Sequence, residues 1–441
     1  MSKDRRGSRP LPFATESRSE AVRTVVIVAT LDTKGEEAAY VRDHIAAWGL
    51  DTILIDPGLL GEPSVEATIS RYDVAKAADT TLEALLARGE KGFAISKQTE
   101  GLCNLVLELH ARGKLDGIIS IGGGQGTSIG TAAMRALPVG VPKLMLSTVA
   151  SGRFQFGPYV GTKDLCMMHS VTDILGLNVI SRPILRNAAN AIAGMALRRL
   201  VEEQASGRPK GADPSVAITM LGITTPCVMR IKKNLETRGY EVVPFHANGT
   251  SGPAMEKLID EGRFLGVIDL STHEVIDNQN GGLAGAPDRL EAITRNRIPA
   301  VVSVGGSDYL LYETLAKAPA RVQGRAYMVH NAQMTCLAPT PDEMVAAAQE
   351  MIERLNRAQG PTVVVLPLKG FSSPNQEGRE LWVPEGNRAV IEEFQARLRP
   401  EIPLLLVDQH LNDPAFADLV AECMQLLLQG ESASTAGALQ G

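Results

Sequence analysis

A glycine-rich stretch directly behind a short apolar run constrains the fold of this chain more than any other segment. The run contains Ile118, Ile119 and Ile121, and four glycines follow within positions 122–126. Short apolar runs of this kind form the buried strands of parallel sheets. Glycine lets the backbone approach a ligand closely, and a helix that begins at Thr127 would offer unpaired N–H groups to an anion. The stretch therefore predicts a cradle for a phosphate or a carboxylate; a tight turn that binds nothing is the alternative.

The glycine stretch matches neither of the two common phosphate-binding motifs. A Walker A loop needs a lysine after its last glycine, whereas Thr127 follows Gly126. Counted from Gly122 or Gly124, the third glycine of the dinucleotide fingerprint falls on Thr127 or Ile129. The residues thus predict an anion site that belongs to neither motif.

The composition argues against several classes of protein. The 441 residues carry a formal net charge of -6, so a nucleic-acid groove is not expected. No apolar run reaches the roughly 18–20 residues of a membrane span, so no membrane partner is expected. The five cysteines lie far apart without CxxC spacing, which predicts reduced thiols, a cytoplasmic location and no zinc site. Residues 1–21 lack the apolar core of a signal peptide and are predicted to form a disordered tail.

The first part of the chain predicts a strand, a helix and a second strand, over residues 24–29, 36–48 and 52–55. The loop behind the first strand carries Asp32, Thr33 and Lys34. In open α/β sheets ligands bind at the carboxyl ends of the strands, so this loop and the glycine stretch can face one crevice. Lys34 would then be a charge partner for phosphate; a solvated surface lysine is the alternative. We further expect helices over 72–88 and 102–112 and a short strand over 93–95.

Two more polar segments resemble ligand-binding loops. Ser147–Gly152 lies behind a predicted strand over 143–146, and Gly161–Asp164 is a polar cluster of the same kind. Small hydrogen-bonding side chains suit phosphate or ribose oxygens, although each segment alone would also suit a capped helix start. Together the four segments predict a nucleotide-sized ligand. The predicted nucleotide-binding residues are Asp32, Thr33, Lys34, Gly122, Gly123, Gly124, Gln125, Gly126, Thr127, Ser147, Ser151, Gly152, Thr162 and Asp164.

A break in the sequence separates two domains. A long helix is predicted over 182–204, and residues 206–214 behind it contain two glycines and two prolines. We therefore predict a first domain over 22–206 and a second over 214–429, followed by a disordered tail over 430–441.

The second domain repeats the pattern of the first. A shift of 190 residues places Gly49 on Gly239, and the run Ala300–Ser307 resembles Gly117–Gly124. The second copy has lost Lys34 and the run of glycines, so the two ligand sites should differ. We predict an α/β fold of two Rossmann-like domains with mostly parallel sheets and a cleft between them.

The second domain holds most of the side chains suited to acid–base chemistry. We predict His246, His273, Glu274 and His410 as catalytic residues, because each belongs to a polar segment that follows an expected strand. No pair has a metal-ligand spacing such as HExxH, so no metal site is predicted. A polar interface between the domains, without chemistry, is the alternative.

Several motifs of the chain occur in the same order in a known family. They are Asp32–Gly35, Gly122–Thr127, Ser147–Gly152, Leu221–Val228 and His410–Asp413. From about residue 22 to 425 the chain resembles the Tm-one-like ATP-binding family, which is similar to the N-terminal inhibitory domain of the tomato mosaic virus resistance protein. The resemblance implies two Rossmann-like domains, ATP in the first domain and a homodimer. Without a lysine after the last glycine, fast hydrolysis of the P-loop kind is not expected.

The residues leave three functions open. The first is an ATP-binding protein that acts in the interdomain cleft on a small anionic metabolite, either a carboxylate or a hydroxylated compound, with His273 or Glu274 as base. Asp32 or Asp164 could hold Mg²⁺ through a water, although no residue pattern requires the ion. The second is a nucleotide-regulated binding or scaffold protein without turnover. The third is a hydrolase or lyase that uses the second domain without a nucleotide.

Overall fold

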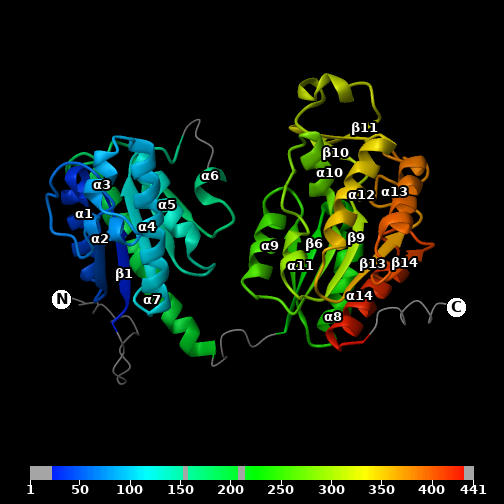
Figure 1. The fold of residues 1–441 in the computed structure, drawn as a ribbon, viewed down its shortest axis with the longest axis horizontal. Helices are drawn as coiled ribbons and strands as arrows, with labels where there is room; N and C mark the ends of the chain where they lie inside the picture. The colour runs from blue at the N-terminus through cyan, green and yellow to red at the C-terminus, as the bar shows by residue number, and fades with distance from the viewer. Residues whose placement is uncertain (1–21, 152–156, 207–213, 432–441) are drawn as a thin grey trace, which may run out of the picture. The chain divides into compact units, whose positions relative to one another are not determined.

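The computed structural model describes residues 22–151, 157–206 and 214–431. The chain forms two compact units, residues 1–207 and 208–441, each with its own sheet and core (Figure 1). The tail predicted over 1–21, most of the tail predicted over 430–441, and Gly152 lie outside the described residues. Within the described part of the chain, no helix is long and apolar enough to cross a membrane.

The first domain is built on a five-stranded parallel sheet. Its strands are β1 (Thr24–Val28), β2 (Asp51–Ile55), β3 (Gly117–Gly122), β4 (Lys143–Ser147) and β5 (Cys166–His169). Every residue of β1, β3 and β4 is buried, as expected for apolar runs in a sheet that is covered on both faces. The strand order is β2-β1-β3-β4-β5, and all neighbours are parallel.

Helices cover both faces of this sheet. They are α1 (Leu31–Ala46), α2 (Arg71–Lys76), α3 (Leu82–Ala87), α4 (Lys91–Ala111), α5 (Gly124–Ala136), α6 (Gly157–Val160) and α7 (Ser181–Ser206). Successive residues of a strand point to opposite faces. Val25 and Ile27 of β1 join a core with α1 and α7, whereas Val26 and Val28 join one with α4 and α5. The helices that follow β1 and β3 therefore lie on opposite faces, so the loops in front of them diverge at the carboxyl edge.

The second domain contains a six-stranded parallel sheet in the order β14-β13-β9-β8-β6-β7. Its strands are β6 (Ser215–Met220), β7 (Glu241–His246), β8 (Gly266–Ser271), β9 (Ala300–Gly305), β13 (Thr362–Pro367) and β14 (Leu404–Val407). A small antiparallel sheet is inserted between β9 and β13 (Figure 1). It consists of β10 (Leu310–Tyr312), β11 (Tyr327–Asn331) and β12 (Met334–Leu337).

Helices also cover both faces of the second sheet. They are α8 (Thr225–Glu236), α9 (Ser251–Asp260), α10 (His273–Asn280), α11 (Glu291–Arg295), α12 (Pro341–Leu355), α13 (Pro384–Arg397) and α14 (Pro414–Leu428). Short 3₁₀ turns lie at Gly222–Thr224, Leu315–Lys317 and Ala320–Val322. Ala217 of β6 joins the core beneath α9–α13, whereas Val216 and Ile218 join the core beneath α8 and α14.

The two sheets share one topology, which confirms the predicted fold class of two Rossmann-like α/β domains. When the strands of each domain are numbered along the chain, both sheets have the order 2-1-3-4-5. The sheet of the second domain adds β14 as a sixth strand at its edge. The predicted match of Ala300–Ser307 with Gly117–Gly124 is wrong, because β9 is the fourth strand and the third is β8. A glycine pair behind an apolar run marks a turn, and any strand of a parallel sheet can end in one.

Two local predictions in the first domain are wrong. Residues 93–95 lie in α4 and not in a strand. This helix buries Ala94, Gln98, Leu102 and Val106, one residue per turn, so the apolar triplet belongs to a helical stripe. The helix predicted over 72–88 is divided into α2 and α3, because the chain turns between them at Asp79, whose φ is 54°.

The packing of α2 on α4 gives a test of the first core. A Cβ on Gly101 would lie 1.9 Å from the Val74 carbonyl oxygen, so Gly101→Ala must push the two helices apart. We expect the free energy of unfolding to fall by about 1–3 kcal/mol, measured by chemical denaturation. Gly92→Ala is the control on the same helix, because its Cβ would meet nothing within 4 Å. Equal stability of the two variants would contradict this packing.

Candidate functional site

A cavity of about 570 Å³ lies at the carboxyl edge of the first sheet. Its lining comes from the loops behind β1 and β3, the loop behind β2, and the α3–α4 region. The lining residues are Thr30, Asp32, Thr33, Lys34, Gly58, Leu59, Leu60, Leu85, Leu86, Gly89, Glu90, Lys91, Ala94, Gly123, Gly124, Gln125 and Gly126. The strand order reverses between β1 and β3, and ligands of open α/β sheets bind at this switch point.

The glycine stretch forms one side of the cavity. Gly122 ends β3, and α5 begins at Gly124, three residues earlier than predicted. A Cβ on Gly122 would lie 2.8 Å from the Gly126 Cα, so the turn itself requires glycine there. A Cβ on Gly124 would meet nothing within 4 Å. The N-cap residue of α5 is Gly123, which has no side chain to cap the helix, so the first N–H groups and the positive end of the helix can face an anion.

The loop behind β1 contributes charge to the same cavity. Helix α1 begins at Leu31, so Asp32, Thr33 and Lys34 form its first turn, where a loop was predicted. Lys34 interrupts the helix with a φ of -129°, and its Nζ donates a hydrogen bond to the Ile174 carbonyl oxygen. An ammonium group held beside a glycine-rich helix N-terminus is suited to phosphate.

A buried ion pair, which the sequence analysis missed, holds another wall of the cavity. Asp56 Oδ2 accepts hydrogen bonds from Arg71 Nε at 2.8 Å and Nη2 at 2.6 Å, and its Oδ1 accepts from the Leu31 and Gly58 N–H groups. Arg71 also donates to the carbonyl oxygens of residues 60 and 61. Gln98 Nε2 donates to the Gly58 carbonyl oxygen at 3.1 Å. The network fixes the loop behind β2 against the start of α1.

Nothing in the sequence singles out these wall residues. Asp56 and Arg71 are 15 positions apart and look like two of the chain's many surface charges. Lys91, Leu59 and Leu60, which also line the cavity, belong to no phosphate-binding pattern. A useful signal is the strand-end rule, since Asp56 comes directly behind β2.

Two predicted hydroxyl residues support the glycine stretch from behind. Thr127 and Ser147 are fully buried, and their hydroxyl oxygens are 2.6 Å apart. Thr127 Oγ1 also bonds with the Gly123 carbonyl oxygen at 2.7 Å, and the Val149 N–H donates to Ser147 Oγ. These groups therefore position the loop and do not line the cavity. Ser151 is exposed behind β4, also outside the lining.

The structure corrects the prediction that Thr162 and Asp164 join the glycine stretch. Both precede β5, at the amino edge of a parallel sheet whose carboxyl edge holds the cavity. Asp164 accepts hydrogen bonds from the Gly140 N–H and from Lys143 Nζ, each at 2.9 Å, in front of β4. These contacts place Asp164 away from any phosphate on the glycine loop.

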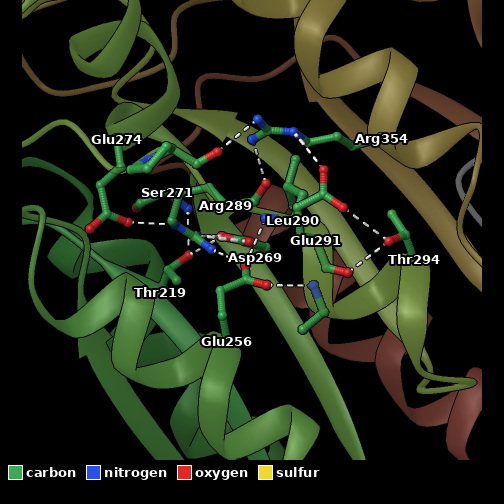
Figure 2. A network of polar contacts seen from close by, with 12 residues as sticks. Thr219, Glu256, Asp269, Ser271, Glu274, Arg289, Leu290, Glu291, Thr294 and Arg354 are labelled. Carbon is green, nitrogen blue, oxygen red and sulfur yellow. Dashed lines mark hydrogen bonds and ion pairs between the residues drawn. The ribbon is translucent and has the colours of Figure 1, made fainter. Parts of the chain in front are cut away.

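In the second domain, Glu274 belongs to a buried charge cluster around Arg289 (Figure 2). The guanidinium group contacts the carboxylates of Glu256, Asp269 and Glu274, and all four side chains are at most 5% exposed. The Thr219 hydroxyl donates to Asp269 at 2.8 Å. Burial raises the pKa of Glu256 to about 7 and also raises that of Glu274. The cluster ties β6, β8, α9 and α10 together.

His273 is buried beside this cluster. Its Nδ1 donates to the Gly306 carbonyl oxygen at 2.9 Å, and its Nε2 is 3.3 Å from Asp277 Oδ2. The ring stacks on Tyr309 with centroids 3.9 Å apart. Burial alone would lower the pKa of His273, but Asp277 and the Gly306 carbonyl raise it. Because neither His273 nor Glu274 has exposed surface, the structure contradicts a role in which they touch a substrate.

The other two predicted catalytic histidines differ in exposure. His410 is 5% exposed; its Nδ1 accepts from the Asn412 N–H at 3.1 Å, and its Nε2 is 3.0 Å from the Ser372 carbonyl oxygen. This ring therefore joins two backbone segments, and burial lowers its pKa. His246 is exposed at the end of β7, and burial and His330 lower its pKa. A catalytic role for His246 stays a prediction.

No group of three or more potential metal ligands occurs within the described ranges. Three carboxylates surround one guanidinium group, and an uncompensated buried charge is unfavourable.

The raised pKa of Glu256 predicts an unusual dependence of stability on pH. The pKa of Glu256 is about 7 in the folded protein and 4.5 in the unfolded chain. A carboxyl group whose pKa is raised by folding stabilises the fold fully below the unfolded pKa, here below pH 4.5. That contribution is lost as the pH rises through 7, and the loss is on the order of 3 kcal/mol. We expect denaturant unfolding of the second domain to show this fall between pH 5 and about pH 8.

Glu256→Gln should flatten this pH slope, whatever its effect on absolute stability. Glu241→Gln, which makes the same change at an exposed carboxylate at the start of β7, is the control and should keep the slope. An unchanged slope in Glu256→Gln would show that Glu256 does not titrate in this range.

Comparison with known proteins gives two family models that match nearly the whole chain. The N-terminal domain of an uncharacterised protein family (UPF0261) matches residues 23–200, and its C-terminal domain matches residues 213–428. A UPF0261 protein of Clostridium tetani is 38% identical over 402 residues, which are 91% of this chain and 98% of that protein. A UPF0261 protein of Mesorhizobium japonicum is 38% identical over 408 residues, covering 92% of this chain and 99% of that protein.

A plant relative is also similar over both domains. The ToMV susceptible protein tm-1(GCR26) of Solanum lycopersicum is 33% identical over 417 residues, which are 90% of this chain and 55% of that protein. This match confirms the resemblance inferred from the motifs. Among solved structures, MurG of Acinetobacter baumannii aligns over 95% of each chain with 10% identity and a TM-score of 0.21, which carries no argument about function. The chain therefore belongs to the UPF0261 family and contains its N-terminal and C-terminal domains in that order.

Proposed function

We propose that the first domain binds ATP in the cavity at the carboxyl edge of its sheet. The observation that carries this proposal is that the glycine stretch and Lys34 line one cavity at the switch point of the strand order. A volume of about 570 Å³ falls in the range of small-molecule sites. The lining combines N–H donors, two lysines and an apolar wall, which are the groups that a nucleotide needs.

The residues of the cavity divide between the two ends of a nucleotide. The phosphates would lie on the N–H groups at Gly124–Gly126, with Lys34 and Lys91 as cationic partners. The base would lie against the leucines of the opposite wall, among them Leu60 and Leu86, which are 63% and 43% exposed. Asp32 lines the same cavity, and its carboxylate is suited to hold a water of Mg²⁺.

Gly124→Val tests this placement. A side chain at Gly124 would enter the open space in front of α5, where the phosphates are proposed to bind. We therefore expect the ATP affinity measured by calorimetry to fall about tenfold or more, which corresponds to a loss of binding free energy of about 1.4 kcal/mol. Gly194→Val is the matched control: it lies on α7, away from the lining, and its Cβ also meets nothing within 4 Å. Unchanged affinity in Gly124→Val would refute the placement, and absence of ATP binding by the unmodified protein would refute the ligand.

A second candidate is nucleotide binding that regulates association without turnover. The titratable side chains that line the cavity are Asp32, Lys34, Glu90 and Lys91, and none of the predicted catalytic residues is among them. No lysine follows Gly126, so the P-loop means of stabilising phosphoryl transfer is missing.

Binding without turnover has its own measurable outcome. We expect phosphate release from ATP to stay at the rate seen with Gly124→Val, together with a nucleotide-dependent change in self-association by light scattering. A homodimer that forms only with ATP would support this candidate. Rapid phosphate release that Gly124→Val abolishes would exclude it and would favour an ATP-dependent enzyme.

A further inference from the structure

A second cavity, of about 370 Å³, lies in the second domain where the loop behind β13 meets α13. Six of its lining residues belong to α13 and recur every three or four positions, so they share one face of the helix. The other two come from the loop. The lining residues are Leu368, Trp382, Pro384, Asn387, Arg388, Ile391, Glu392 and Gln395. The cavity is separate from the proposed nucleotide site, which lies in the other domain.

Buried amides fix the loop that closes this cavity. Asn375 Oδ1 accepts hydrogen bonds from the Phe371 N–H at 3.2 Å and from Asn387 Nδ2 at 2.6 Å. Asn375 Nδ2 donates to the Leu381 carbonyl oxygen at 2.9 Å, directly beside Trp382. Asn375 and Asn387 are at most 2% exposed. The backbone that carries the Trp382 indole is therefore held in place before any ligand arrives, which lowers the entropy lost on binding.

The charges in the cavity are one cation and one anion, a helical turn apart. Within the described residues, Arg388 and Glu392 take part in no ion pair, whereas Arg397 further along the same helix is paired with Glu393. In a helix, an ion pair four residues apart is more stable when the glutamate precedes the basic residue. Here Arg388 precedes Glu392, which is the less favourable order for a salt bridge between the two side chains. Both groups are free to bind a ligand.

The remaining lining is apolar apart from two amides. Leu368, Trp382, Pro384 and Ile391 form the apolar side, with the Trp382 indole half-buried. Asn387 Oδ1 is buried and has no hydrogen-bond partner in the part of the chain that the structure describes. Apart from the two charged groups, the lining thus offers one apolar side and few polar atoms.

We propose that this cavity binds a free α-amino acid with an aromatic or large apolar side chain. The ring would lie on the apolar side against Trp382. The α-carboxylate would pair with Arg388 in a charge-assisted contact. The α-ammonium would pair with Glu392 one turn further along the helix. A polyphosphate does not fit, because the cavity offers one cation and places a carboxylate beside it.

The two tryptophans of the chain give a direct readout. Trp48→Phe removes the exposed indole of the first domain and leaves Trp382 as the sole tryptophan. In this variant, we expect L-phenylalanine to change the tryptophan fluorescence saturably. Phenethylamine lacks the carboxylate and 3-phenylpropionate lacks the ammonium, and each should bind about tenfold more weakly because one charge-assisted contact is lost.

Substitutions on α13 assign the two ends of the ligand. Arg388→Gln should weaken L-phenylalanine and 3-phenylpropionate about tenfold and leave phenethylamine unchanged. Glu392→Gln should weaken L-phenylalanine and phenethylamine about tenfold and leave 3-phenylpropionate unchanged. Arg397→Gln, on the same helix outside this cavity, is the control and should bind like the parent. No saturable signal below about 10 mM would overturn the proposal, and so would equal losses in Arg388→Gln and Arg397→Gln. Neither result bears on ATP binding in the first domain.

Discussion

The cavity of the first domain follows from one constraint on parallel sheets. Crossovers between parallel strands are right-handed, so the direction in which the chain moves along the sheet decides which face the next helix covers. From β1 the chain moves to one side to reach β2, and it reaches β4 by moving to the other side from β3. Helices α1 and α5 therefore lie on opposite faces, and the loops in front of them separate. The cavity lies in the space between those loops.

Buried charges then decide which parts of each domain are rigid. In the first domain the Asp56–Arg71 pair holds the loop behind β2, so a charged network supports a wall of the cavity. In the second domain the Arg289 cluster joins strands and helices inside the core and reaches no cavity lining described above. Breaking a buried pair by removing one partner leaves a charge in a poorly solvated place, which costs about 3–5 kcal/mol. The same chemistry thus positions a site in one domain and stabilises the core in the other.

The strands and the location of the first cavity could be predicted because they depend on local pattern. Apolar runs bounded by glycine or polar residues give the strands, and the strand-end rule then places the glycine stretch and Lys34 at one edge. The error at Thr162 and Asp164 arose because β5 is short and only partly buried, so its pattern is weak. When β5 is not recognised in the sequence, nothing indicates that Thr162 and Asp164 precede a strand and lie at the amino edge of the sheet. The sequence gives no sign that Glu274 is buried in an ion pair, because its partner, Arg289, is 15 residues away and looks like a surface residue.

The shared topology of the two domains shows what glycine contributes at the switch point. The third strand of the first domain runs into Gly122–Gly124, whereas the third strand of the second runs into Ser271, Thr272 and His273. There the Thr224 and Ser271 hydroxyl oxygens are 2.9 Å apart and fully buried, which joins the two loop starts directly. His273 adds a ring that packs on Tyr309. In the second domain, side chains fill the positions that glycine leaves open in the first. We therefore expect a nucleotide site in the first domain and not in the second, although both sheets have the same strand order.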